Sequence, residues 1–387
     1  MHVLFKTFNV GNGDCIALLL QDGEHEIHLL IDCGNYTEEV DNFVADRFHN
    51  FIDYLVVTHI DNDHIVGLIN MLERKPDLTI RHIYYNSYQR TSEDSKHWDE
   101  NLKANILRVM GNLPIVADML DNKISAVKAK TLSEAILSNP EWKRVWRREY
   151  ITDETRPINL DDNMGRLIFL SPTKEALNSL DHLYRRLFWE KLYKEKREDY
   201  DDEETIYEAL LRSVNNKTVS SKINISSTEL KKESLLQLAD VPLKPITETN
   251  KASIAFIWER NEHRILFLGD ASPEIVCSSL RKIYSEEKPV IFDAIKVSHH
   301  GSAENTSKEL VSLADSSRYF FTGRTSSAPS INTLARIVTA NLPQGIASRE
   351  INYNRKSPAI EELDKDTALQ ADLHFTIQEN TDYEFDC

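Results

Sequence analysis

The chain has 387 residues, of which 41% are hydrophobic and 28% charged, and its formal net charge at pH 7 is −16. This composition is typical of a globular protein with a large buried core. The acidic charge argues against a general nucleic-acid binder, because surfaces that bind phosphate backbones are normally basic.

Two further features concern the cellular compartment. The sequence has no 18-residue apolar run, and its N-terminus lacks the basic and apolar regions of a signal peptide. The cysteines Cys15, Cys33, Cys277 and Cys387 are scattered without a CxxC pair, which is typical of reduced structural thiols. We therefore expect a cytoplasmic protein that does not contact membranes.

The first third of the chain is predicted to consist mainly of strands and turns. The turn Gly11-Asn12-Gly13-Asp14 leads into a strand and not a helix, so we interpret it as a hairpin turn and not as a phosphate loop. A helix is expected directly after the polar stretch that follows the fourth strand. The expected strands are Val3–Val10, Ile16–Leu20, Glu26–Ile31, Tyr54–Val57 and Ile80–Tyr85, and the expected helix is Ile65–Leu72.

The middle of the chain has a helical pattern from Asp99 to Tyr150 and then a strand at Arg166–Leu170. Residues 173–250 combine an apolar helical face, a run of charges and a Ser/Thr/Lys-rich stretch. We interpret this segment as a helical insertion, a lid or a partner-binding segment, within one domain formed by residues 1–172 and 251–387.

The last third is again predicted to alternate between strands and helices. Arg166–Leu170 and Ser253–Trp258 are expected to be neighbours in one sheet. The strands expected in this part are Ser253–Trp258, Arg264–Leu268, Ala294–Val297, Tyr319–Thr322 and, as the final strand, Asp372–Gln378.

Three clusters of imidazole and carboxylate groups follow predicted strands: His59–His64, Leu268–Asp270 and Val297–Ser302. Ligands collect beyond the strand ends of α/β sheets, so the clusters are expected to converge. Mixed imidazole and carboxylate sets suit Zn²⁺, Mn²⁺ or Fe, and a shared carboxylate can bridge two ions. Taken singly, each cluster has a structural alternative: a helix cap at Asp63, a turn at Gly269-Asp270, or core histidines at His299-His300.

These residues together resemble the metallo-β-lactamase-fold hydrolases, and within them the soluble branch related to the competence protein ComEC. Asp61 stands where most of the superfamily has histidine, and no equivalent of the middle histidine is recognisable between His64 and Asp270. The resemblance implies an αββα sandwich. The matching motifs are Val10–Cys15, Ile31–Gly34, Thr58–His64 with Gly67-Leu68, Leu268–Ala271 and Ser298–Ser302.

The resemblance also implies roles for individual residues and a cofactor of one or two Zn²⁺ or Mn²⁺ ions per chain. Asp63, Asp270 and His300 are the expected catalytic residues, with His300 contacting substrate or moving a proton. Asp14 and Asp32 are expected to orient the His59–His64 loop. The implied ligands are His59 and Asp61 for one ion, Asp63 and His64 for the other, Asp270 between them, and His299.

The function expected from this resemblance is metal-dependent hydrolysis of a phosphodiester in DNA, RNA or a nucleotide, through water activated by the ions. Two alternatives stay open at this point. One is hydrolysis of a small ester, lactone or nucleotide, which the acidic charge does not oppose. The other is a regulated effector subunit that a partner protein controls through residues 173–250.

Overall fold

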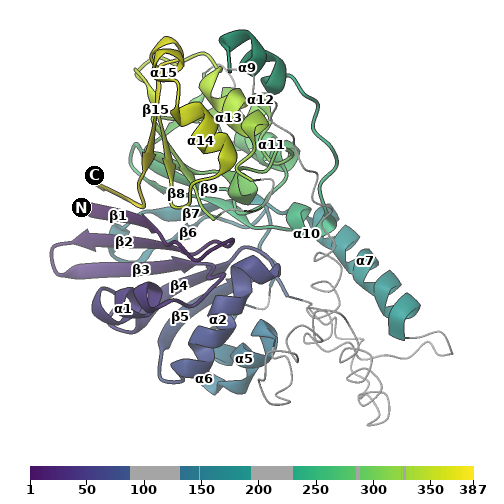
Figure 1. The fold of residues 1–387 in the computed structure, drawn as a ribbon. Helices are drawn as coiled ribbons and strands as arrows, with labels where there is room; N and C mark the ends of the chain where they lie inside the picture. Colours follow the sequence, from purple (N-terminus) through teal and green to yellow (C-terminus); the bar gives the residue numbers. More distant parts are fainter. Residues whose placement is uncertain (88–130, 148, 193–229, 285–287, 324, 326–327) are drawn as a thin grey trace.

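The computed structural model describes residues 1–87, 131–147, 149–192, 230–284, 288–323, 325 and 328–387. Its strands form two large sheets (Figure 1). The first sheet has the order β16-β1-β2-β3-β4-β5. Its strands are β1 (His2–Thr7), β2 (Ile16–Asp22), β3 (His25–Ile31), β4 (Phe51–Val57), β5 (Thr79–Tyr85) and β16 (Asp382–Asp386).

The second sheet has the order β15-β14-β13-β11-β9-β8-β7-β6. A separate pair is formed by β10 (Val290–Phe292) and β12 (Ala314–Ser316). The strands of the second sheet are β6 (Ile158–Asn159), β7 (Arg166–Ser171), β8 (Ala255–Arg260), β9 (His263–Phe267), β11 (Ala294–Lys296), β13 (Arg318–Phe321), β14 (Arg349–Tyr353) and β15 (Phe375–Glu379).

The two sheets face each other across a layer of apolar side chains. Phe5 of the first sheet contacts Phe320 and Phe267 of the second, with ring centroids 4.7 Å and 5.8 Å apart. Trp258, which is fully buried, belongs to the same layer. Strand side chains alternate between the two faces of a sheet. The side chains on the outer face of each sheet are also apolar, so that face requires helices to cover it.

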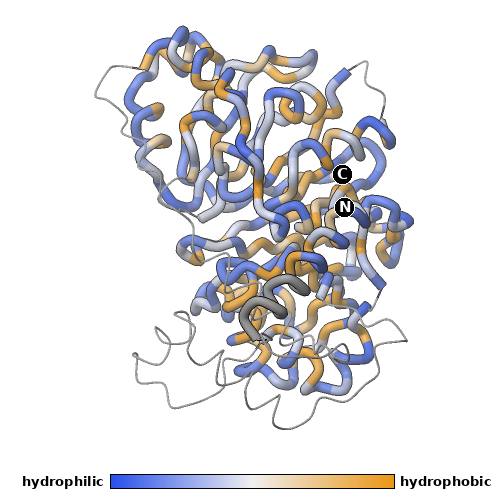
Figure 2. Tube along the Cα trace, turned by 90° about the vertical axis from the view of Figure 1, so that its right-hand side faces the viewer, coloured by the Kyte–Doolittle hydropathy of each residue, from blue (hydrophilic) through white to orange (hydrophobic). Residues whose placement is uncertain are grey.

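Helices cover both outer faces, so the protein is a four-layer αββα sandwich (Figure 1). Figure 2 shows hydrophobic positions running through the layers and hydrophilic positions at the outer turns. The helices on the first sheet are α1 (Glu38–Asp46), α2 (Asn62–Arg74), α5 (Leu132–Ser138) and α6 (Pro140–Val145). Those on the second are α9 (Lys232–Ala239), α11 (Pro273–Ile283), α12 (Lys308–Leu313), α13 (Ile331–Val338), α14 (Pro358–Asp364) and α15 (Thr367–Asp372).

Strand direction brings several loops to one edge of the sandwich. In the first sheet β3, β4 and β5 are parallel, and in the second β9, β11, β13, β14 and β15 are parallel. Helices make the connections, as parallel pairing requires. The backbone hydrogen bond from Ile254 N to Thr58 O, 2.8 Å long, joins the two sheets at this edge. The loops after the parallel strands therefore meet there.

The segment 173–250 is described in part. It contains α7 (Lys174–Leu192), α9 and the short α10 (Glu248–Lys251), whereas the charged run and most of the Ser/Thr/Lys-rich stretch lie outside the described residues. Leu235 and Ala239 of α9 are buried in the core beneath α13. From α13, Asn332 Nδ2 donates to Leu238 O at 2.9 Å. Thus the C-terminal part of the segment packs on the second sheet's helical layer.

Several sequence predictions are confirmed and others need correction. β7 and β8 pair directly, as expected, with Leu167 opposite Trp258. The first strand ends at Thr7 and not at Val10, and the helix expected at Ile65 begins at Asn62. The strand expected at the end of the chain begins at Phe375, because α15 continues to Asp372, and it is not final, since β16 follows. Much of the helical pattern from 99 to 150 lies outside the described residues.

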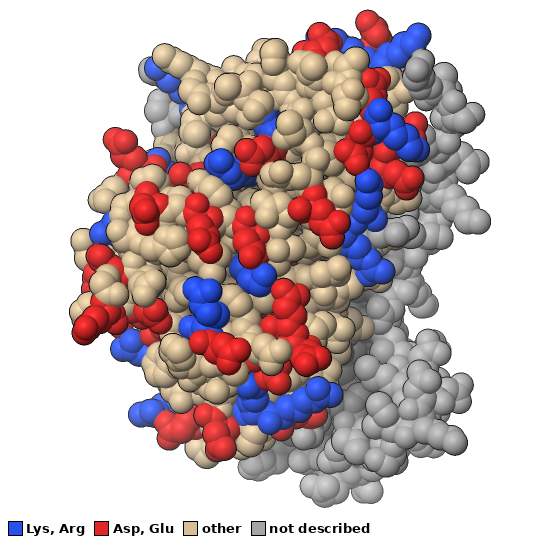
Figure 3. Space-filling model, turned by 60° about the vertical axis from the view of Figure 1, so that its left-hand side comes forward, with Lys and Arg blue, Asp and Glu red and all other residues tan. Residues whose placement is uncertain are grey.

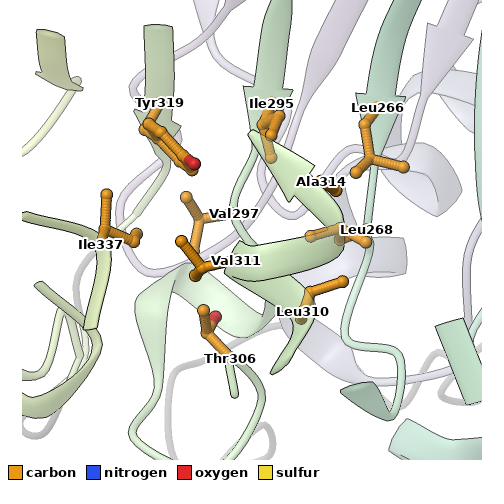
Figure 4. A pocket seen from close by; sticks show the side chains of 10 residues that line it. All are labelled: Leu266, Leu268, Ile295, Val297, Thr306, Leu310, Val311, Ala314, Tyr319 and Ile337. Carbon is orange, nitrogen blue, oxygen red and sulfur yellow. The ribbon is translucent and has the colours of Figure 1, made fainter. Parts of the chain in front are cut away.

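A small apolar pocket lies between the second sheet and helices α12 and α13 (Figure 4). Leu268 and Val297, which begin two of the site loops, line it together with Leu310 and Tyr319. These loops therefore start from buried apolar residues. On the opposite side of the molecule from α7, acidic and basic side chains are interspersed (Figure 3). None of the helices in the described ranges combines the length and apolar character needed to cross a membrane.

Candidate metal centre

Short loops at the strand ends carry all the candidate residues. Asp32 follows β3, and Thr58 to Asp61 follow β4, so that Asp63 and His64 lie in the first turn of α2. Asp270 follows β9, and His299 and His300 lie in the 3-10 turn Ser298–Gly301 after β11. Asp14 precedes β2 at the same edge. The structure thus brings the predicted residues from both sheets together.

Two glycine motifs hold the Asp63 backbone in place. A Cβ atom on Gly13 or on Gly34 would lie 2.0 Å from the carbonyl oxygen of Asp63, so no larger residue fits at either position. The amide of Asp14 donates to that oxygen at 3.0 Å, and the amide of Cys33 donates to His64 O at 2.8 Å. The Gly-rich turn and the Asp-Cys-Gly motif therefore clamp the start of α2.

His59 and His64 are each fixed through Nδ1. The Nδ1 atom of His64 lies 2.8 Å from Asp32 Oδ2. The Thr58 hydroxyl donates to the same carboxylate at 2.6 Å, so it is free to accept from His59 Nδ1, which lies 3.0 Å away. In the neutral form of each imidazole the proton therefore sits on Nδ1, which leaves the lone pair on Nε2.

His299 and His300 are also held through Nδ1. The Nδ1 atom of His299 lies 2.9 Å from an acceptor, Asn305 Oδ1, and 3.1 Å from a donor, Asn250 Nδ2. The Nδ1 atom of His300 lies 2.9 Å from the carbonyl oxygen of Thr322 and 3.1 Å from Asp14 Oδ1. Both histidines have positive φ, 49° and 55°. Such backbone strain, about 1–3 kcal/mol per residue, persists where surrounding contacts enforce it, commonly at functional sites.

The Nε2 atoms point into one shared space and define two clusters. The first cluster is His59, Asp61, Asp270 and His299: His59 Nε2 lies 3.5 Å from Asp61 Oδ2 and 3.5 Å from Asp270 Oδ2, and His299 Nε2 lies 3.5 Å from the same Asp270 oxygen. The second cluster is Asp63, His64, Asp270 and His300: His64 Nε2 lies 3.5 Å from Asp270 Oδ1, and His300 Nε2 lies 3.2 Å from Asp63 Oδ2.

These donors fit divalent metal ions. Atoms bound tetrahedrally to one Zn²⁺ at about 2.1 Å lie about 3.4 Å apart, which matches the observed spacings. Among the described residues, His59 Nε2, His64 Nε2 and Asp270 Oδ1 are buried without a hydrogen-bond partner. Leaving such atoms unpaired is costly, so three of them converging on one point fit a cation that accepts their lone pairs. His59, His64 and Asp270 thus form a candidate cation site.

Charge in the centre favours two ions. Five carboxylates, those of Asp14, Asp32, Asp61, Asp63 and Asp270, lie beside one ammonium group, that of Lys296. With neutral imidazoles, five negative charges and one positive charge leave −4, which two divalent cations would cancel. Three of the five carboxylates, those of Asp14, Asp32 and Asp270, are fully buried, where uncompensated charge is strongly destabilising.

Without ions, protons on the histidines cancel part of the negative charge of the carboxylates. Burial and the neighbouring His64 lower the pKa of His59, but Asp270 and Asp61 outweigh them and raise it to about 9. At His300 burial also lowers the pKa, but Asp14 and Asp63 outweigh burial and raise the pKa to about 10. Despite burial, the surrounding histidines hold the pKa of Asp270 well below its usual range. Metal binding must therefore displace protons from the imidazoles.

Comparisons with known proteins give only a distant likeness. Among solved structures, the chain is similar to the metallo-β-lactamase fold protein YhfI from Bacillus subtilis, with a TM-score of 0.36, 9% identity and 100% of both chains covered. A diphosphatase of the PhnP family has a TM-score of 0.38 and 9% identity, over 100% of this chain and 98% of that one. Zn²⁺-bound PqqB from Methylobacterium extorquens has a TM-score of 0.38 and 11% identity, with both chains fully covered.

No family model and no curated protein matches the sequence. The assignment of the αββα sandwich therefore rests on the strand order and layers described above, and the assignment of the site rests on its geometry.

The geometry refines two expectations from the sequence. His300 is wholly buried, so direct contact with substrate does not fit, whereas the His299 side chain is 31% exposed. The Asp14 side chain contacts His300 and only its backbone holds the His59–His64 loop, while Asp32 contacts that loop as expected.

Sequence reasoning missed the residues that hold the imidazoles. Asn250 in the short helix α10, and Asn305 and Thr322 in loops, are single polar residues, and nothing in their local sequence distinguishes them. Lys296 had a usable signal, because it is a lysine within a short apolar strand.

Proposed function

We propose that this protein is a metal-dependent hydrolase that holds two divalent ions, Zn²⁺ or Mn²⁺, at the shared edge of its two sheets. One observation carries the proposal: four imidazoles are tied through Nδ1 and turn Nε2 toward carboxylates, with Asp270 facing both clusters through different oxygens. Histidine ligands of metals characteristically donate their other ring proton to an oxygen in this way.

The two clusters would each hold one ion, and Asp270 would be shared. This assigns both His299 and His300 as ligands, so His299 supplies the histidine for which the sequence shows no equivalent between His64 and Asp270. Bound ions would supply Lewis acidity, which polarises an oxygen of the substrate and activates water. The protein's own part is to fix the ligands: Asp32 orients His64, Asn305 orients His299, and Asp14 with Thr322 orients His300.

Exposure indicates where the substrate enters. The side chains of His59, His64, Asp270 and His300 are at most 2% exposed, whereas Asp61, Asp63 and His299 are 17%, 35% and 31% exposed. The open side of the centre is therefore lined by two carboxylates and one imidazole. Asp63 is the more exposed of the two carboxylates and lies beside His300.

We propose a phosphodiester as the substrate class. The support is the resemblance of five sequence motifs to the ComEC-like branch. Asp61 and Asp63 would repel an anion from the ion-free centre, so recognition of phosphate must come from the ions and not from a basic surface. Nucleic acid and small cyclic nucleotides both contain this bond.

The test begins with protein stripped of metal by a chelator. Calorimetric titration with Zn²⁺ and with Mn²⁺ should show two sites, and His59→Ala and His64→Ala should each lose ion binding. His28→Ala is the matched control, because His28 is a buried histidine outside the centre that stacks on Phe48. Absence of ion binding in the folded wild-type protein would overturn the proposal.

Rates on bis-p-nitrophenyl phosphate, p-nitrophenyl acetate, a simple lactone, single- and double-stranded DNA, RNA and a cyclic dinucleotide then identify the substrate class. Turnover of the acetate or lactone alone would reject the phosphodiester and retain the metal-dependent hydrolase.

A further inference from the structure

Lys296 is an ammonium group buried behind the centre. It lies in β11, between β9 and β13 of the second sheet, and is 1% exposed. In the described part of the chain no other lysine is buried. Removing an ammonium group from water costs several kcal/mol even after relaxation, so this residue requires specific partners.

Strand alternation directs Lys296 toward the other sheet. Its neighbour Ile295 packs in the core under the helices, and Ala294 packs in the layer between the sheets. Since side chains two residues apart share a face, Lys296 also points into the layer between the sheets. There its Nζ donates to Asp14 Oδ2, which comes from the first sheet, and contacts Gly269 O at 3.4 Å.

Asp14 contacts both Lys296 and His300. One carboxylate oxygen, Oδ2, accepts from Lys296, and the other, Oδ1, accepts from the Thr322 hydroxyl and lies 3.1 Å from His300 Nδ1. Asp14 is itself 1% exposed, so both oxygens are held by protein groups alone. The ammonium thereby fixes one end of a carboxylate whose other end, together with the Thr322 carbonyl oxygen 2.9 Å from Nδ1, fixes the imidazole.

We propose that Lys296 is a positioning residue for the second cluster: it holds Asp14 so that His300 keeps its proton on Nδ1 and presents Nε2 beside Asp63. This inference rests on the proposed function, because it concerns the ion that Asp63, His64 and His300 would share. Of the first cluster, His59 is held by Thr58 and His299 by Asn305. The role of Lys296 is therefore specific to one of the two ions.

The experiment titrates metal-free Lys296→Met with Zn²⁺ beside the wild type. Methionine matches the length of the side chain but lacks the ammonium group. One binding event should keep its wild-type affinity, and the other should weaken by about tenfold or more, the usual effect of losing an outer partner of a metal ligand. His300→Ala should lose the same event. Lys251→Met is the control, because Lys251 is a partly exposed lysine near the centre that pairs with Glu248.

A second readout reports the imidazole directly. Long-range proton–nitrogen correlation spectra of zinc-loaded, ¹⁵N-histidine protein should show His300 with its proton on Nδ1 in the wild type. In Lys296→Met that signal should change, whereas the signals of His59 and His64 should not. A purely structural lysine would alter the melting temperature without this selective change.

The outcomes separate the two proposals. If the wild type binds no ion, the proposed function fails and this inference fails with it. If the wild type and Lys296→Met both bind two ions with equal affinity, only this inference is overturned. Should Lys296→Met not fold, Asp14→Asn combined with Lys296→Met removes the isolated buried carboxylate. Wild-type affinity for the second ion in that double variant would also overturn the positioning role.

Discussion

The carboxylate of Asp32 lies 2.8 Å from Nδ1 of His64, and both side chains are at most 1% exposed. The same carboxylate accepts from the Thr58 amide at 2.7 Å and from the Thr58 hydroxyl, which in turn contacts His59. One buried aspartate from the first sheet therefore orients a histidine of each cluster.

Replacing Asp32 by Asn should weaken ion binding by about 10- to 100-fold. The amide nitrogen that replaces one carboxylate oxygen cannot accept a hydrogen bond from the protonated Nδ1 of His64. The measurement is the Zn²⁺ dissociation constant from calorimetry. Asp53→Asn is the matched control: Asp53 is equally buried in the same sheet but accepts from His28 N and Arg81. Equal affinities in the two variants would remove Asp32 from the centre.

Asp270→Asn should reduce turnover far more than stability. Asparagine keeps the shape and one oxygen, but it lacks the second anionic oxygen that faces the other cluster. We expect a rate loss on the order of 10²-fold or more on bis-p-nitrophenyl phosphate, with a small change in melting temperature. Near-normal turnover at saturating metal would show that Asp270 is only part of a turn.

The ion-free protein should lose stability as pH rises from 7 to 10. His59 and His300 have folded pKa values of about 9 and about 10, above the unfolded value of about 6.5. Their contribution is therefore fully present below pH 6.5 and is lost as pH rises through 9 to 10. Melting temperatures measured with chelator should fall across this range relative to zinc-loaded protein. Parallel curves for the two forms would contradict the assignment.

Helix α9 allows a test of how the segment 173–250 is attached. Leu235 is fully buried, whereas its neighbour Leu236 is 42% exposed. We expect Leu235→Ala to lower the free energy of unfolding by about 2–5 kcal/mol and Leu236→Ala to have little effect. Urea denaturation measures both. Equal, small effects would show that α9 does not pack on the sandwich in solution.

Local pattern accounts for the parts of the fold that were predicted. β2, β3 and β7 are apolar runs bounded by turn residues, and the polar stretch after β4 stands out because histidine and aspartate are rare together in loops. By contrast, β16 alternates Tyr383 and Phe385 with acidic residues and pairs with β1 from the other end of the chain. No local window contains that partner, so the strand was missed.

The same distinction applies to the site. Ligand-type residues cluster in sequence, so His59, His64 and Asp270 could be predicted. The groups that orient them do not cluster: Asn250 reaches His299 from α10 and Asn305 from the loop before α12. Asp14 reaches Lys296 across the two sheets. Which histidine serves which ion depends on these tertiary contacts, and a linear motif does not contain them.

The ligand sets come from both halves of the sandwich, with His59 and His64 on the first sheet's loops and Asp270, His299 and His300 on the second's. Ions bound there would cross-link the two sheets, because the sheets could separate only if the ions were released. By thermodynamic linkage, each ion present at 100 times its dissociation constant would add about 2.7 kcal/mol to the free energy of unfolding. The supply of metal would then determine the stability of the protein against unfolding as well as its rate of turnover.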